Sequence, residues 1–247
     1  MLFVIYHLYF IINTFTSESV CSGHPDKICD QVSDAILDEA FKVDKYSRVA
    51  VETMVTKNFL AMAGEVTTKA KLNYKKIAQR VVKNLGYTIP VLNFSEKSEI
   101  IVKIHTQSPE IAVGVNNLGA GDQGQMYGYA CNETKEFMPL PIMLAHRLAM
   151  GIDKLRETRR LPYLRPDGKT QVTVGYEKNI PKTIENVVLA VPHDEKIKLS
   201  QVKEDLFNML VTPILQEYGY KIKRNQLIVN GTGFWHIGGP SSDTGVT

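Results

Sequence analysis

The order of predicted secondary structure is the feature of this 247-residue chain that most constrains its fold. In a first block, Pro25 opens a helix over about 25–41, and alternating apolar residues predict strands over 48–56 and 59–67. A second helix, capped by Asn73, closes at Gly86, and an apolar strand follows at Glu99–His105. This block reads helix–strand–strand–helix–strand.

The same order occurs again in the second half of the chain. Helical spacing of leucine and isoleucine predicts a helix over about 140–157, followed by strands at Gln171–Tyr176 and Glu185–Val191. A helix over about 200–217 and a strand at Gln226–Val229 complete the block. Two such blocks predict an α+β fold of repeated helix–strand–strand–helix–strand units, with antiparallel sheets backed by helices.

A glycine-rich connection, Gly114 to Gly128, separates the blocks and predicts tight turns or mobility. We therefore expect one domain over residues 14–118 and a second over 119–247. Residues 1–13 form an atypical apolar extension. It has no Lys or Arg in front and no small-residue cleavage site behind, which argues against a signal peptide, and it is too short to span a bilayer.

Composition excludes several functional classes. The formal charge of +3 is small and no basic run is interleaved with aromatic residues, so we expect no nucleic-acid partner. We expect no membrane partner either. The three cysteines show no CxxC spacing and offer no zinc site, which predicts free thiols in a reducing compartment, the cytoplasm.

The segment Gly23-His24-Pro25-Asp26-Lys27 stands at a predicted helix start. Free backbone N–H groups and the positive end of the helix dipole, beside His24 and Lys27, favour phosphate. Asp26 is a hard oxygen ligand of the kind that Mg²⁺ prefers. Taken alone, the segment is better explained as an ordinary capped helix with proline and an acid in its first turn.

Two carboxylates lie on a face of predicted strands that otherwise carries small or apolar side chains. Glu52 stands between Ala50 and Met54, and Glu65 shares a face with Ala63. An unpartnered charge is costly in apolar surroundings, so a ligand or partner is one explanation. A solvated sheet surface is the other.

Several ordered strings connect these features. Thr16-Ser17-Glu18-Ser19-Val20 precedes the GHPDK segment, and the later strings are QSP at 107–109, GAGDQG at 119–124, GYA at 128–130, NET at 132–134 and LRPD at 164–167. In content and order, over about residues 14–240, the chain resembles the S-adenosylmethionine synthetase family. The resemblance covers the amino-terminal and central domains, and the family's third, carboxy-terminal domain has no counterpart in the chain.

The resemblance implies a methionine adenosyltransferase. The sulfur of L-methionine attacks C5′ of ATP, S-adenosylmethionine forms, and the displaced triphosphate is hydrolysed to phosphate and pyrophosphate. Such chemistry requires an aligned thioether and cationic groups around the leaving triphosphate. The family further implies Mg²⁺ and K⁺ as cofactors, and a homodimer or higher homo-oligomer with active sites shared between subunits.

Residue roles carry over by matching positions. His24 and Lys169 match catalytic residues, and Asp26 and Glu52 match ligands of Mg²⁺ and K⁺. The matched methionine-binding residues are Glu65, Gln107 and Asp243. The matched ATP-binding residues are His24, Asp122, Asp167, Gly168, Lys169, Phe234, Trp235 and Asp243. Phe234 stands where the family has an arginine, whose bidentate contacts phenylalanine cannot make.

Two alternatives follow from the third domain that has no counterpart and from Phe234 in place of the family's arginine. The chain could be a catalytically inactive, truncated homologue that acts as a fragment or dimerisation partner. It could also bind nucleotide without methionine chemistry.

Overall fold

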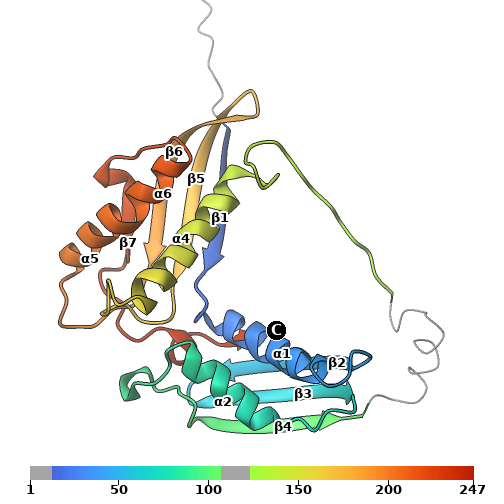
Figure 1. Ribbon diagram of the computed structural model, residues 1–247. Helices are drawn as coiled ribbons and strands as arrows, with labels where there is room; N and C mark the ends of the chain where they lie inside the picture. The colour runs from blue at the N-terminus through green and yellow to red at the C-terminus, as the bar shows by residue number, and fades with distance from the viewer. Residues whose placement is uncertain (1–12, 107–122) are drawn as a thin grey trace, which may run out of the picture.

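The computed structural model describes residues 13–106 and 123–247. These residues form two four-stranded sheets, each covered on one face by helices (Figure 1). Each sheet has its own apolar core between strands and helices, one around Ile28, Val55 and Tyr87, the other around Leu148, Val172 and Leu206. None of the helices in the described part is both long and apolar enough to cross a membrane.

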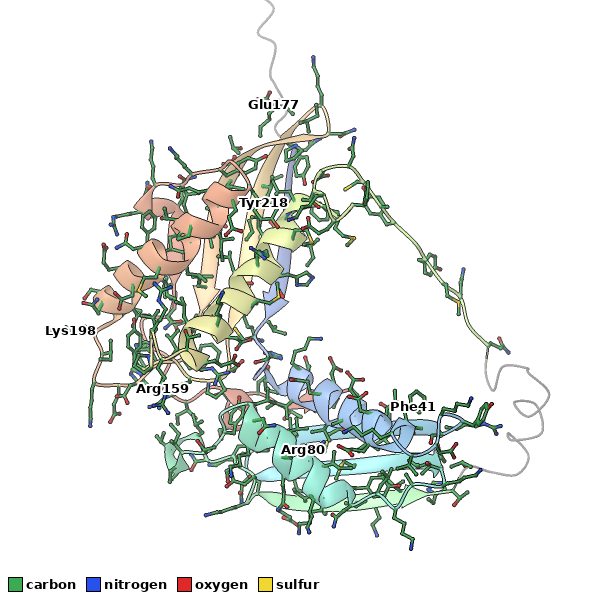
Figure 2. All side chains as sticks on the ribbon, in the orientation of Figure 1. Phe41, Arg80, Arg159, Glu177, Lys198 and Tyr218 are labelled. Carbon is green, nitrogen blue, oxygen red and sulfur yellow. The ribbon has the colours of Figure 1, made fainter. Side chains whose placement is uncertain are left out.

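The first unit follows the predicted order: α1 (Pro25–Phe41), β2 (Arg48–Thr56), β3 (Phe59–Thr67), α2 (Tyr74–Asn84) and β4 (Glu99–His105). Strands β2 and β3 pair antiparallel, whereas β4 runs parallel to β3. Helices α1 and α2 pack side by side on the sheet. On their outer side, Arg80 of α2 reaches Glu39 of α1 at 2.8 Å (Figure 2).

The second unit repeats this arrangement with α4 (Leu140–Glu157), β5 (Lys169–Glu177), β6 (Ile180–Ala190) and β7 (Leu227–Val229). Its second helical segment consists of α5 (Leu199–Leu206), a π-helical turn at Phe207–Val211 and α6 (Thr212–Glu217). Here too the hairpin β5–β6 is antiparallel and β7 is parallel to β6. The α+β fold is confirmed, and its sheets are mixed rather than purely antiparallel, because each closing strand returns to the hairpin through a helical crossover.

The two ends of the described chain are exchanged between the units. Strand β1 (Asn13–Val20) precedes the first unit but pairs antiparallel with β5 of the second sheet. Strand β8 (Gly245–Val246) follows the second unit but pairs antiparallel with β2 of the first. Each unit therefore gains its fourth strand at the equivalent edge from the far end of the sequence. The expected domain boundary at residues 118 and 119 lies outside the described residues.

The connections made by this exchange run between the two sheets and touch each other closely. A Cβ atom at Gly245 would lie 2.2 Å from the carbonyl carbon of Pro25, and one at Gly23 would lie 2.5 Å from the oxygen of Pro166. Real Cβ atoms do not approach that closely, so glycine is required at both points. The start of α1 is thereby held against segments from both units.

The uncovered face of the first sheet carries both apolar and charged side chains. Strict alternation buries Val51, Thr53 and Val55 of β2 beneath the helices and turns Met54 outward. Met54 is 40% exposed and pairs with Val246 of β8, which is 54% exposed. The other outward residues of β2 and β3 in this face are Ala50, Glu52, Ala61, Ala63 and Glu65.

Candidate active site

The start of α1 lies at the junction of the units, and His24 caps it. Its Nδ1 accepts the backbone N–H of Asp26 at 3.3 Å, and Pro25 fixes the first helical turn. The imidazole is 4% exposed. Its Nε2 is buried, has no hydrogen-bond partner among the described residues, and lies 3.9 Å from Oδ2 of Asp243. A buried polar atom without a partner is costly, so the site is built for an additional group.

The segment from Asp167 to Lys169 leads into β5 beside this histidine. Asp167 is 1% exposed, and its two oxygens accept the backbone N–H groups of Gly168 and Gly239, each at 2.7 Å. These bonds fix the course of the chain into Lys169. The Lys169 Nζ lies 3.6 Å from Oδ2 of Asp243. His24, Lys169 and Asp243, all predicted site residues, are thus brought together.

Charge and burial act in opposite directions on this group. Burial lowers the pKa of His24 below 6.5, while the neighbouring Asp167 carboxylate opposes that shift. Burial raises the pKa of Asp167 above 3.8, against the stabilising hydrogen bond from Gly239. His24 is therefore held neutral at pH 7, with an Nε2 whose hydrogen-bonding capacity is unused.

The predicted metal ligands lie along β8. Oδ1 of Asp26 accepts the N–H of Val246 at 3.1 Å, and Oε2 of Glu52 accepts the Oγ1 hydroxyl of Thr247 at 2.7 Å. Within residues 13–106 and 123–247, no cluster of three or more His, Cys, Asp or Glu side chains could hold a metal ion. Any cation here would need further ligands from its substrate or from solvent.

Of the predicted methionine-binding residues, Asp243 lies at this junction and Glu65 does not. Glu65 lies on the open sheet face, where its Oε1 is 3.2 Å from Nε2 of His105. Among the described residues, the Glu65 carboxylate forms no ion pair with the junction group of His24, Lys169 and Asp243. Gln107 and Asp122 lie outside the described residues.

Phe234 and Trp235 precede the loop that reaches Asp167. The Phe234 ring is 73% exposed and stacks on His236, with ring centroids 5.5 Å apart and planes 16° apart. The Trp235 carbonyl accepts the N–H of His193 at 3.0 Å. An exposed phenylalanine ring can stack on a planar base but cannot pair with phosphate.

A partly buried ion pair next to the junction was not predicted from the sequence. Asp153 of α4 accepts the N–H of Ser22 at 2.8 Å and lies 3.6 Å from Arg156. It therefore holds the segment that leads into His24. An acid next to Ile152 on the apolar side of a predicted helix was the available signal.

A cavity outside this junction lies at the start of β1. It measures about 710 Å³, and its lining includes Phe15, Tyr129 and Tyr176. No predicted site residue lines it.

Comparison with known proteins gives consistent matches over both units. The model of the S-adenosylmethionine synthetase N-terminal domain matches residues 12–109, and the model of the central domain matches residues 117–235. The chain is 46% identical to an S-adenosylmethionine synthase of Pseudothermotoga lettingae, over 94% of the chain and 63% of that relative. It is 44% identical to one of Leifsonia xyli subsp. xyli, over 96% of the chain and 64% of the relative.

The chain spans less than two thirds of the length of these relatives. The two domain models follow each other in the family's order and together account for most of the chain. The chain belongs to the S-adenosylmethionine synthetase family, and it contains that family's N-terminal and central domains.

Proposed function

We propose that this chain takes part in methionine adenosyltransfer, which makes S-adenosylmethionine, phosphate and pyrophosphate from ATP and L-methionine. The observation that carries the proposal is the convergence of His24, Lys169 and Asp243 at the start of α1. A buried, unpaired imidazole nitrogen beside a lysine and a helix start forms a phosphate-type site.

The geometry supports the residue roles that the family resemblance implies. His24, through its free Nε2, and Lys169, through its ammonium, stabilise the negative charge of the leaving triphosphate. Asp167 keeps the lysine segment in place through its two backbone hydrogen bonds. Phe234 and Trp235 are the proposed ATP-binding residues whose aromatic rings would stack on the adenine base.

The residues present fit a Mg²⁺ ion that is bound jointly by the protein and the substrate. Asp26 offers carboxylate oxygen beside the triphosphate position, and Mg²⁺ commonly binds one or two carboxylates together with substrate phosphates. When bound, the ion would neutralise triphosphate charge. Glu52, which already accepts a bond from Thr247, is the proposed K⁺ ligand, and carbonyl or solvent oxygen would complete its shell.

The proposed methionine site favours a homodimer with shared active sites. Glu65 would pair with the substrate ammonium, and Gln107 and Asp243 would complete the contacts. Glu65 lies on the open sheet face that also exposes Met54 and Val246, and a second copy packed there would cover this face. The free cysteines, of which Cys21 and Cys29 are buried, suit a cytoplasmic protein.

The test separates binding from turnover. Calorimetry of the purified chain with Mg²⁺ and inorganic tripolyphosphate should show binding that Lys169→Met weakens by about 10- to 100-fold, the value of one charge-assisted contact. Lys75→Met, which removes an exposed lysine of α2, should leave affinity unchanged. Incubation with ATP, methionine, Mg²⁺ and K⁺, assayed for S-adenosylmethionine, then measures turnover.

Equal tripolyphosphate affinity in Lys169→Met and the unaltered chain would contradict the proposed site. Binding of tripolyphosphate and of a second copy, without turnover, would instead favour the non-catalytic partner. Exposed Phe234, in place of a phosphate-binding arginine, is the observation that supports this second candidate.

A further inference from the structure

Tyr87, which follows α2, places a hydroxyl in the junction beside residues of the proposed site. The side chain is 1% exposed, and its ring meets Phe94 edge-on at 5.4 Å within the first unit's core. Its hydroxyl donates to the carbonyl oxygen of Gly23 at 2.5 Å. Gly23 immediately precedes His24, so this bond fixes the peptide from which the imidazole extends.

The other side of the same hydroxyl meets the loop from the second unit. Gly239 has φ +62°, and a Cβ atom there would lie 2.3 Å from the Tyr87 oxygen. The N–H of Gly239 donates to Asp167 at 2.7 Å. Tyr87 therefore touches the segment that carries His24 and the segment that holds Asp167.

We propose that Tyr87 is a positioning residue of this site, holding the Gly23 and Gly239 backbones together so that His24 and Asp167 keep their mutual placement. The role in ligand binding rests on the function proposed above, whereas the role in holding the two backbones does not. Apolar packing alone would not require the hydroxyl, because Phe94 and the surrounding core contact the ring.

Replacing Tyr87 by phenylalanine would remove the contacts that the hydroxyl makes with two backbone segments. Phenylalanine would keep the ring, but the buried Gly23 carbonyl would lose this side-chain donor, and the constraint on Gly239 would relax. Burial also raises the pKa of Tyr87 above 10, so the hydroxyl remains a proton donor across the neutral range. Loss of the hydroxyl is therefore expected to loosen the backbone around Gly23 and around Gly239.

The matched pair of variants is Tyr87→Phe and Tyr163→Phe. Tyr163 also donates a short hydrogen bond, to Asp205 at 2.6 Å, but on the outer helices of the second unit. Amide hydrogen exchange of Gly239 and Gly168 should be about 10-fold faster in Tyr87→Phe and unchanged in Tyr163→Phe. The Mg²⁺–tripolyphosphate affinity should fall about 10-fold in Tyr87→Phe alone.

The hydrogen-exchange experiment and the tripolyphosphate-binding experiment can give negative results independently of each other. Unchanged exchange at Gly239 and Gly168 in Tyr87→Phe would overturn the proposal, as would equal changes in both variants. If the unaltered chain binds no tripolyphosphate, the proposed function loses its support, while the exchange experiment still decides the role of Tyr87. If Tyr87→Phe does not fold, Phe94→Leu frees the ring and should accelerate Gly239 exchange in the same direction.

Discussion

At the scale of single residues, burial at the junction and around it sets protonation. His193, 1% exposed, lies beside the segment 234–236, and its Nδ1 is 3.3 Å from both the Val191 carbonyl and the Asn230 amide. Burial lowers the pKa of His193 below 6.5, and the backbone hydrogen bond to Val191 opposes that shift. The folded state therefore binds a proton at this site less readily than the unfolded state.

This difference predicts a pH effect with a definite sign. Between the folded pKa of His193 and 6.5, the unfolded state binds more protons than the folded state. The free energy of unfolding therefore rises with pH through that window, and the contribution of His193 is fully present above it. Urea denaturation at pH 7.5 and 5.5 should show less loss of stability on acidification in His193→Gln than in the unaltered chain. Equal losses in the two proteins would contradict the assignment.

At the scale of secondary-structure elements, the exchanged strands tie the units together. Thr16 of β1 lies directly opposite Thr173 of β5, and their hydroxyl oxygens are 2.9 Å apart although the residues are 157 positions apart in sequence. Ser19 of β1 adds a 2.7 Å contact to His146 of α4. An element from the start of the chain is thereby part of the second unit's sheet.

This pairing predicts a cross-link. In a Cys131→Ser background, the pair Thr16→Cys and Thr173→Cys should form a disulfide on mild oxidation, seen as a mobility shift on a non-reducing gel. Closing so long a loop should raise unfolding free energy by up to about 5 kcal/mol. Thr14→Cys with Thr173→Cys is the control, because Thr14 pairs with Gly175 and lies two positions out of register. Equal cross-linking of both pairs would refute the register.

At the scale of the whole molecule, the open face of the first sheet is the surface that we propose a second copy covers. Met54 and Val246 are paired across β2 and β8, and both are exposed. An uncompensated charge buried in an interface costs several kcal/mol, so one substitution there should separate the subunits.

The prediction concerns Met54→Glu. In sedimentation velocity, we expect the unaltered chain to form dimers and Met54→Glu to raise the dimer dissociation constant about 100-fold or more. Val43→Glu places the same charge at a 66% exposed residue beyond α1 and should leave dimers intact. A dimer that tolerates Met54→Glu would show that this face is not the interface.

The sequence alone predicted the repeated order of elements and the α+β class, because apolar periodicity is local. It also placed Pro25 and His24 at a helix start. The parallel pairing of β4 and β7 needed the tertiary structure, since strand patterns carry no direction. The exchange of β1 and β8 also needed the tertiary structure, because no local sequence signal determines which sheet an edge strand joins.

The residues of the candidate site likewise fall into those that the sequence predicted and those that only the structure revealed. Family strings selected His24, Asp167, Lys169 and Asp243, and the structure brings all four to one junction. Tyr87, Gly239 and Asp153 were not predicted, because their importance arises from close approach between segments far apart in sequence. Local pattern thus determined which elements form and which residues have suitable chemistry. Only packing decided which backbones touch, because glycine contacts and buried hydroxyl bonds depend on distances that sequence spacing does not fix.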